Sequence, residues 1–176
     1  MKLKVYILLL GGMFLLAGCS DFLDVVPKDK QTAEQLYSTK AGFYTAVNGI
    51  YNRLSSEDLY GGKMSWEAID IMSKRYETTK AKLYFKDLSN NDYSSTYVAG
   101  ALSIIWQKSY ELILAANLLI EQVDNQRGIL SETEANLMKG EMLAVRAFLH
   151  LDMFRLFGPR WDNNPDALSI PYNEST

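Results

Sequence analysis

The sequence predicts an all-α fold made of tetratricopeptide-like helical hairpins with a long irregular insertion. Apolar residues recur at helical spacing in three long segments, and helix-start signals precede two of them. No segment alternates apolar and polar residues as the strands of a half-buried sheet do. With 176 residues, of which 48% are hydrophobic and 22% charged, the chain is large enough for one domain with its own core.

The first predicted helices follow residue 31. Thr32-Ala33-Glu34-Gln35 fits a capping box, in which a hydroxyl and a side-chain amide satisfy free N–H groups at a helix start. A second helix is predicted from Thr39, because five apolar residues fall on one stripe: Phe43, Val47, Ile50, Tyr51 and Leu54. Turn-forming residues at 55–58 and 61–62 end this helix.

Residues 58–99 form the predicted irregular insertion, since they keep no sustained helical period. Residues 64–72 are compatible with one short helix that carries Trp66, Ile69 and Met72. The turn formers Asn90-Asn91-Asp92 and Ser94-Ser95-Thr96 interrupt the rest. Loops of this length in compact domains are usually functional or disordered.

A helix is predicted over residues 101–124, the most apolar part of the chain after the N-terminal segment. Leu112 belongs to one apolar face, whereas Trp106 and Tyr110 belong to another. A helix that is apolar on two faces packs between layers, so we assign Trp106 and Tyr110 to core packing rather than to ligand contact.

The last predicted helix begins at the capping box Ser131-Glu132-Thr133-Glu134 and runs to Phe157. Gly158-Pro159 ends it, because glycine is favoured just past a helix and proline cannot continue one. Together with the preceding helix it forms a long antiparallel hairpin, although only one such unit is visible. We expect residues 161–176 to have no regular structure.

Composition excludes several classes of function. Without Lys2 and Lys4, sixteen basic residues face twenty-one acidic ones, a charge of −5 that argues against a nucleic-acid partner. Cys19 is the only cysteine and His150 the only histidine, which excludes an internal disulfide and a cysteine- or histidine-based metal cluster. No carboxylate spacing matches a calcium loop or a glycosidase pair. We therefore predict no catalytic residue, metal or cofactor.

The N-terminus has the features of a lipoprotein signal peptide. Lys2 and Lys4 precede an apolar run from Val5 to Leu16, which is shorter than the ~20 residues that a bilayer span needs. Leu16-Ala17-Gly18-Cys19 resembles a bacterial lipobox, whose cysteine thiol is lipidated before cleavage. The sequence thus predicts a signal peptide at 1–18, a lipidated tether at 19–30 and a helical domain at 31–176. The alternative is a plain secretory signal with an incidental cysteine.

Four blocks, in order, resemble the SusD/RagB family of outer-membrane nutrient-binding lipoproteins. The lipobox continues as Cys19-Ser20-Asp21-Phe22-Leu23-Asp24, and Asn48-Gly49-Ile50-Tyr51 closes an early helix. The third block is Trp106-Gln107-Lys108-Ser109-Tyr110 with Ala116-Asn117. The fourth, residues 140–148 leading to Leu156-Phe157-Gly158-Pro159, is close to the family's G-E-x-x-x-x-R-A-F/L signature. Family members are several times longer, so the resemblance implies a SusD-like N-terminal portion: a fragment, a truncated gene product or one piece of a split reading frame.

The resemblance implies a binding protein rather than an enzyme. Such lipoproteins lie over a SusC-like TonB-dependent transporter in the outer membrane of a Gram-negative bacterium and deliver oligosaccharide, or peptide in the RagB branch. Asp21 and Asp24 loosely resemble a signal for export to the cell surface, with a solvated tether as the equal alternative. Two other functions stay open: a helical docking fragment that binds no ligand, and a lipid-anchored glycosidase, for which no acid–base motif is seen.

Aromatic residues of the insertion are the candidate ligand contacts. Trp66, Tyr76 and Tyr84 lie where the resemblance places ligand contacts, and their flat faces suit stacking on sugar rings. The competing interpretation for each is packing under a loop or against the transporter. We expect Glu141 and Arg146 to be polar residues satisfied inside the helical stack, and His150 to be a structural or surface histidine.

Overall fold

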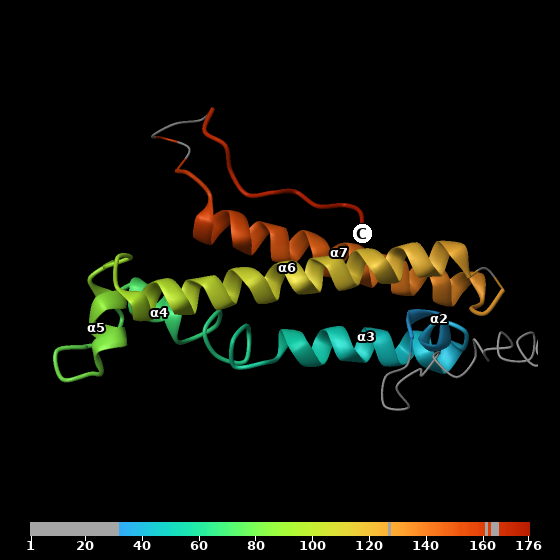
Figure 1. The fold of residues 1–176 in the computed structure, drawn as a ribbon, viewed down its shortest axis with the longest axis horizontal. Helices are drawn as coiled ribbons and strands as arrows, with labels where there is room; N and C mark the ends of the chain where they lie inside the picture. Colours follow the sequence, from blue (N-terminus) through green and yellow to red (C-terminus); the bar gives the residue numbers. More distant parts are fainter. Residues whose placement is uncertain (1–31, 127, 161, 163–165) are drawn as a thin grey trace, which may run out of the picture. The chain divides into compact units, whose positions relative to one another are not determined.

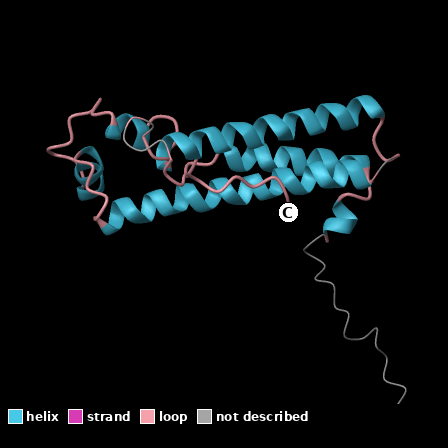
Figure 2. Cartoon of the chain, turned by 90° about the horizontal axis from the view of Figure 1, so that it is seen from above, coloured by secondary structure: helices cyan, strands magenta, loops and turns pink. Residues whose placement is uncertain are grey.

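The computed structural model describes residues 32–126, 128–160, 162 and 166–176. The chain divides into two compact units, residues 1–33 and 34–176, and the second contains nearly all of the described residues. The described residues include helices and no β-strand, which confirms the all-α prediction (Figures 1 and 2). The helices in chain order are α2 (Ala33–Leu36), α3 (Lys40–Leu54), α4 (Ala68–Met72), α5 (Leu83–Ser89), α6 (Thr96–Asn125) and α7 (Glu132–Phe157).

Helix α6 is the centre of the second unit. Helix α7 packs antiparallel along α6 and forms the predicted hairpin, while α3 packs against another side of α6 (Figure 1). The short helices α4 and α5 contact each other, and α5 contacts α6. The prediction that α6 lies between layers is confirmed, because the buried residues of α6 come from more than one of its faces.

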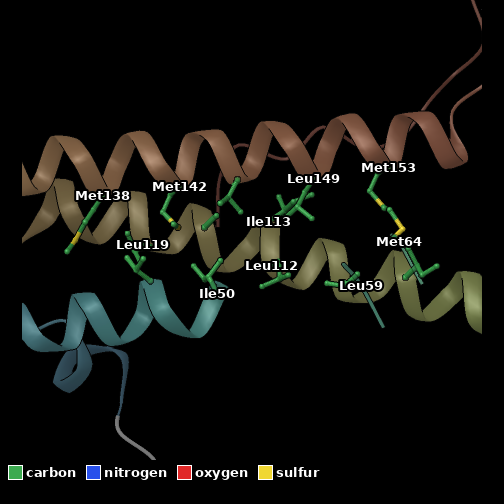
Figure 3. Packing of buried hydrophobic residues seen from close by; sticks show 14 of the residues in the cluster. Ile50, Leu59, Met64, Leu112, Ile113, Leu119, Met138, Met142, Leu149 and Met153 are labelled. Atoms are coloured by element: carbon green, nitrogen blue, oxygen red, sulfur yellow. The ribbon is translucent and has the colours of Figure 1, made fainter. Parts of the chain in front are cut away.

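The hydrophobic core lies between the three long helices. Phe43 of α3, Leu112 and Leu119 of α6, and Met142 and Leu149 of α7 are almost completely buried. Figure 3 shows these layers meeting, with side chains of α7 above those of α6 and Ile50 of α3 below. Each such large apolar side chain stabilises the fold by ~1.5–3 kcal/mol relative to its exposed state.

Both α3 and α7 begin at a side-chain cap, and the start of α7 confirms the predicted capping box. Thr39 Oγ1 accepts a hydrogen bond from the Gly42 N–H at 3.1 Å, so α3 begins at the residue after Thr39. Ser131 and Glu134 form the predicted reciprocal capping box: the Glu134 N–H donates to Ser131 Oγ, and the Ser131 N–H donates to Glu134 Oε2. These bonds satisfy N–H groups that have no partner within the helix.

Helix α7 ends at Phe157 as predicted, although Gly158 acts by a different mechanism. Its backbone is extended, with φ −72° and ψ 158°, and it does not adopt the left-handed conformation common at helix ends. A Cβ atom at this position would lie 2.4 Å from the Phe154 carbonyl oxygen. Glycine is therefore required here by close packing rather than by a positive φ.

Residues 58–99 are more ordered than the sequence indicates. The predicted short helix over 64–72 is shortened to α4, which begins only at Ala68 after a series of turns. Helix α5 was not predicted, because seven residues are too few to display a helical period. Helix α6 begins at Thr96 rather than at residue 101, directly after a turn in which Asp92 Oδ1 accepts hydrogen bonds from Ser94.

Although α6 has 30 residues, neither it nor another helix in the described part of the chain has an apolar stretch long enough to cross a membrane.

Glu134 connects the start of α7 to α3 and makes the fold sensitive to acid. Its carboxylate pairs with the Lys40 ammonium and accepts from the Tyr44 hydroxyl at 3.3 Å. The Lys40 contact, followed by the bonds from Ser131, lowers the pKa of Glu134 from 4.5 to about 2. Because the pKa is lower in the folded state, this stabilisation is present above about pH 4.5 and is lost as the pH falls toward 2.

We expect Glu134→Gln to lower the thermal midpoint at pH 7 and to flatten its decline between pH 4.5 and 2.5. Melting curves followed by circular dichroism across this range measure both effects. Glu132→Gln is the matched control, because Glu132 lies in the same helical turn and makes no hydrogen bond or ion pair with the described residues. Identical pH profiles for the two variants would contradict the assignment of the acid sensitivity to Glu134.

Candidate functional site

An open hollow of about 290 Å³ lies beside α4 and is the candidate ligand site. It brings together two of the predicted ligand residues, Trp66 and Tyr76, whose side chains are 57% and 51% exposed. Its volume is near the lower end of the range typical of ligand sites, ~300–1,000 Å³. The residues that line it are Trp66, Glu67, Ile71, Tyr76, Glu77, Thr78, Ala81 and Phe85.

A chain reversal after α4 places Tyr76 beside Trp66. Lys74 has a positive φ of 58°, and the Arg75 N–H donates back to the Asp70 carbonyl oxygen at 3.0 Å. The Tyr76 hydroxyl then donates to Asp70 Oδ2 at 3.4 Å, which holds the ring near α4. On the other side, the Trp66 backbone N–H donates to the Gly62 carbonyl oxygen at 3.1 Å. These contacts fix the backbone at Trp66 and hold the Tyr76 ring near α4.

Tyr84, the third predicted ligand residue, lies differently from the other two. It is half-buried, and its hydroxyl donates to Glu67 Oε1 at 3.2 Å. Burial, together with the nearby Glu67 carboxylate, raises the pKa of the Tyr84 hydroxyl well above 10. Tyr84 therefore orients Glu67, which lines the hollow. Tyr84 itself borders a second surface depression together with Tyr97 and Ile104.

Two carboxylates and a further aromatic ring of the hollow were not predicted as ligand contacts. Phe85 belongs to the unpredicted helix α5, so no sequence period indicated it. Glu77 Oε1 accepts from the Thr79 N–H at 2.7 Å, and hydrogen bonds from Thr79 lower the pKa of Glu77 below 4.5. Glu67 is oriented by the Tyr84 hydroxyl. Both carboxylates are thus fixed by neutral donors.

Three other hollows among the described residues are larger than the candidate ligand site: the depression bordered by Tyr84 and Tyr97, and two whose linings are unlike that of a sugar-stacking site. Of these last two, one lies near Met64, Met72 and Asp152, and the other lies in the turn between α6 and α7. Neither is lined by an aromatic side chain. Among the described residues, no group of three or more His, Cys, Asp or Glu side chains lies close enough together to hold a metal ion.

A second polar cluster, here called the main-chain clamp, consists of Asn117, Arg146 and His150. Asn117 Nδ2 donates to the carbonyl oxygens of Asn173 and Ser175, at 3.3 and 3.1 Å. Arg146 donates to Asn117 Oδ1 at 3.1 Å and to the Glu174 carbonyl oxygen at 3.3 Å. His150 Nε2 accepts from the Asn173 N–H at 3.2 Å. The clamp therefore contacts the backbone of residues 173–175.

The structure tests the expectations that the sequence raised for Arg146, His150, Trp106 and the C-terminal residues. Arg146 is satisfied within the helical stack as expected, and His150 is structural, with 5% of its surface exposed. Residues 166–176 lack regular structure as expected, yet the C-terminal segment returns along the helices (Figure 1). Trp106 is only half-buried: its ring packs edge-on against Phe157 with centroids 5.0 Å apart.

Arg146→Ala should lower the free energy of unfolding by about 2 kcal/mol, because two charge-assisted hydrogen bonds are lost in a largely buried groove. Arg146→Lys should recover only part of this loss, since the shorter lysine side chain does not extend as far as Nη1, which donates to both oxygens. Chemical denaturation measures both changes. Arg155→Ala is the control: its side chain is 69% exposed and pairs only with Asp152, so its effect should stay below ~0.5 kcal/mol. Equal losses at both arginines would contradict the role of the clamp.

Comparison with known proteins assigns the family. A SusD-like family model, described as "Starch-binding associating with outer membrane", matches residues 21–176. The chain belongs to the SusD-like family. This confirms the resemblance drawn from the four sequence blocks, three of which lie wholly inside the matched region.

Curated relatives of this SusD-like chain are much longer than it is. SusD-like protein P2 of Formosa agariphila is 26% identical over 162 residues, which are 89% of this chain and 30% of that protein. SusD-like proteins P25 and P38 of the same organism are 24% and 25% identical over 161 residues, or 29% of each. The chain therefore spans about 30% of the length of these relatives. No solved structure matches it.

Proposed function

We propose that this SusD-like chain belongs to a surface lipoprotein that binds oligosaccharide and delivers it to a SusC-like TonB-dependent outer-membrane transporter. The hollow between Trp66 and Tyr76 carries this proposal, because it presents two exposed aromatic rings in one depression. The family's description as starch-binding and associated with the outer membrane supports the class of ligand and the location.

The chemistry of the hollow suits a sugar ring. Sugar rings have apolar faces that gain burial when they stack on a flat aromatic side chain, while their hydroxyls need hydrogen-bonding partners. Trp66, Tyr76 and Phe85 supply the aromatic surface, and Glu67 and Glu77 supply acceptors at its edge. The site is thus mostly apolar with a few polar groups, as small-molecule sites usually are.

We propose binding without hydrolysis. A glycosidase needs one carboxylic acid whose raised pKa keeps its proton available near neutral pH. In the hollow, hydrogen bonds from Thr79 lower the pKa of Glu77, so this carboxyl is ionised at neutral pH. Glu67 accepts from the Tyr84 hydroxyl and is likewise placed as an acceptor.

Replacing either exposed ring tests the site. Trp66→Ala or Tyr76→Ala should weaken retention by a bound polysaccharide roughly fivefold, the equivalent of ~1 kcal/mol for one aromatic contact. Tyr84→Ala should also weaken it, because Glu67 loses its orienting hydroxyl. Affinity-gel electrophoresis against a polysaccharide panel measures retention, and circular dichroism checks that helix content is unchanged.

Tyr97→Ala is the matched control for this experiment. Tyr97 is 61% exposed and lies outside the hollow, so its removal should leave retention within twofold of the parent chain. If Tyr97→Ala weakens retention as much as Tyr76→Ala, or if neither ring of the hollow matters, the ligand contacts lie elsewhere.

A helical docking fragment without its own ligand is the second candidate function. One observation favours it: α7 carries a series of large apolar side chains that are each 40% or more exposed, namely Leu137, Leu143, Phe148, Leu151 and Phe154. An exposed apolar surface of this kind is typical of an interaction site. A chain that copurifies with its transporter but is retained by no polysaccharide would establish this alternative. Retention by peptides instead of glycans would indicate a RagB-type relative.

We propose an outer-membrane location with a lipid anchor at Cys19 and a domain facing the cell surface. The proposed boundaries remain those of the sequence: signal peptide 1–18, lipidated tether 19–30 and helical domain 31–176. Cys19 and the acidic residues Asp21 and Asp24 lie outside the described residues. The family's association with the outer membrane supports this location.

A further inference from the structure

The lysines around the aromatic hollow differ from the other cations of the described chain. Outside residues 74–86, every described lysine and arginine makes an ion pair with a carboxylate. Within residues 74–86 only Arg75 does so, with Asp70 at 3.8 Å. Four lysines of this short segment have no ion pair with a described residue: Lys74, Lys80, Lys82 and Lys86.

These unpaired lysines alternate along the chain with residues that line the hollow. Lys80 and Lys82 flank Ala81, and Lys86 follows Phe85. Lys86 lies one turn after Lys82, which precedes the first residue of α5, so the two are neighbours at helical spacing. Lys86 is also near enough to Glu77 to contribute to the lowered pKa of that carboxyl. We call these four lysines the basic rim.

The described carboxylates near the hollow form no ion pair with the basic rim and take their hydrogen bonds from neutral donors. Glu67 is engaged by the Tyr84 hydroxyl, Glu77 by the Thr79 N–H, and Asp87 by the Ser95 hydroxyl at 2.6 Å. Lys82 and Lys86 lie one helical turn apart and repel each other. The rim is also unusual in a chain whose formal net charge is −3. Its natural complement is an anion from outside the chain.

We propose that the hollow binds an acidic saccharide, whose ring stacks on Trp66 and Tyr76 while its carboxylate or sulfate groups are neutralised by the basic rim. This inference rests on the function proposed above and narrows it, because starch, the ligand in the family's description, is a neutral glucan. The adjoining aromatic rings favour a sugar over an anionic lipid surface, since stacking requires a ring-shaped ligand that enters the hollow.

Matched pairs of polysaccharides test the proposal on the full chain. Affinity gels compare polygalacturonate with its methyl ester, and dextran sulfate with dextran, so that each pair differs only in charge. We expect retention by at least one acidic member to be roughly tenfold stronger than by its neutral counterpart at low salt, and to fall steeply with added NaCl. A difference in retention within the polygalacturonate pair indicates recognition of uronate, and a difference within the dextran pair indicates recognition of sulfate.

Substitutions then measure separately what the basic rim and the aromatic rings contribute to retention. Lys82→Gln with Lys86→Gln should reduce retention by the acidic glycan roughly tenfold and leave retention by its neutral counterpart within twofold. Lys108→Gln with Lys139→Gln is the control, since both of these lysines are paired and lie outside the hollow. Trp66→Ala should also weaken acidic retention, because rim and rings hold the same ligand.

The outcomes distinguish failure of this inference from failure of the proposed function. Equal retention by charged and neutral members would overturn the acidic preference and leave glycan binding intact, whereas no retention by any polysaccharide would overturn both. Acidic retention that is insensitive to Trp66→Ala would identify non-specific polyanion binding and refute the shared site. Lysine-dependent binding to phosphatidylglycerol vesicles, without acidic-glycan retention, would assign the rim to a membrane surface and refute the proposal.

Discussion

Leu149→Ala is expected to lower the free energy of unfolding by about 3 kcal/mol, because it leaves a cavity in the middle of the α6–α7 hairpin. Leu149 has no exposed surface, and Figure 3 shows it projecting from α7 toward Ile113 of α6. In a chain of this size such a loss lowers the thermal midpoint by roughly ten degrees. Thermal melting and chemical denaturation both measure it.

Leu151→Ala provides the matched control on the same helix. Leu151 is two residues further along α7, is 55% exposed and is one of the exposed apolar side chains of that helix. The same substitution there should change the free energy of unfolding by less than ~0.5 kcal/mol. If both variants lose equal stability, then α7 does not pack on α6 in the orientation described here.

Helix α7 could be predicted closely from the sequence because it combines two independent local signals. In α7 the Ser131 cap and a periodic set of buried residues, Met138, Met142, Val145 and Leu149, indicate the same start and the same inner face. In α3 the stripe through Phe43 and Ile50 predicts the helix, and the Thr39 cap is found only in the structure. Agreement between capping and period fixes the start of α7 to the residue.

The candidate site could be predicted only in part, because tertiary contacts assemble it. Trp66 and Tyr76 were named for their residue type and their irregular surroundings, not from a pattern that places them together. Their proximity depends on the reversal at Lys74, whose positive φ no sequence rule predicts for lysine. Phe85 and the distinct place of Tyr84 depend on α5, which is too short to show a period.

The main-chain clamp explains why the sequence of residues 173–175 does not reveal that this segment is held against the helices. Asn117 and Arg146 belong to the third and fourth family blocks, and in the structure they bond to each other and to the carbonyl oxygens of residues 173–175. Carbonyl oxygens are present at every residue, so the segment they hold needs no particular sequence. The two blocks thus share one structural task, which is visible only once α6 and α7 lie side by side.

If the proposed lipid anchor at Cys19 is correct, Cys19→Ala is expected to abolish maturation of the chain altogether. The thioether to the diacylglyceryl group needs the thiol of Cys19, and an alanine offers no nucleophile. Acyl chains contribute ~0.8 kcal/mol per buried CH₂, so a protein that loses several of them loses its stable attachment. The expected result is an unprocessed precursor that incorporates no labelled fatty acid, with loss of the mature membrane-bound form.

Ser20→Ala is the control for the anchor, because it changes the adjacent residue and leaves the lipobox Leu16-Ala17-Gly18-Cys19 intact. It should be processed, labelled with fatty acid and recovered in the detergent phase like the parent chain. The two interpretations of the N-terminus differ sharply in this experiment. If Cys19→Ala is still cleaved to mature size and recovered without label, the run from Val5 to Leu16 is a plain secretory signal and Cys19 is incidental.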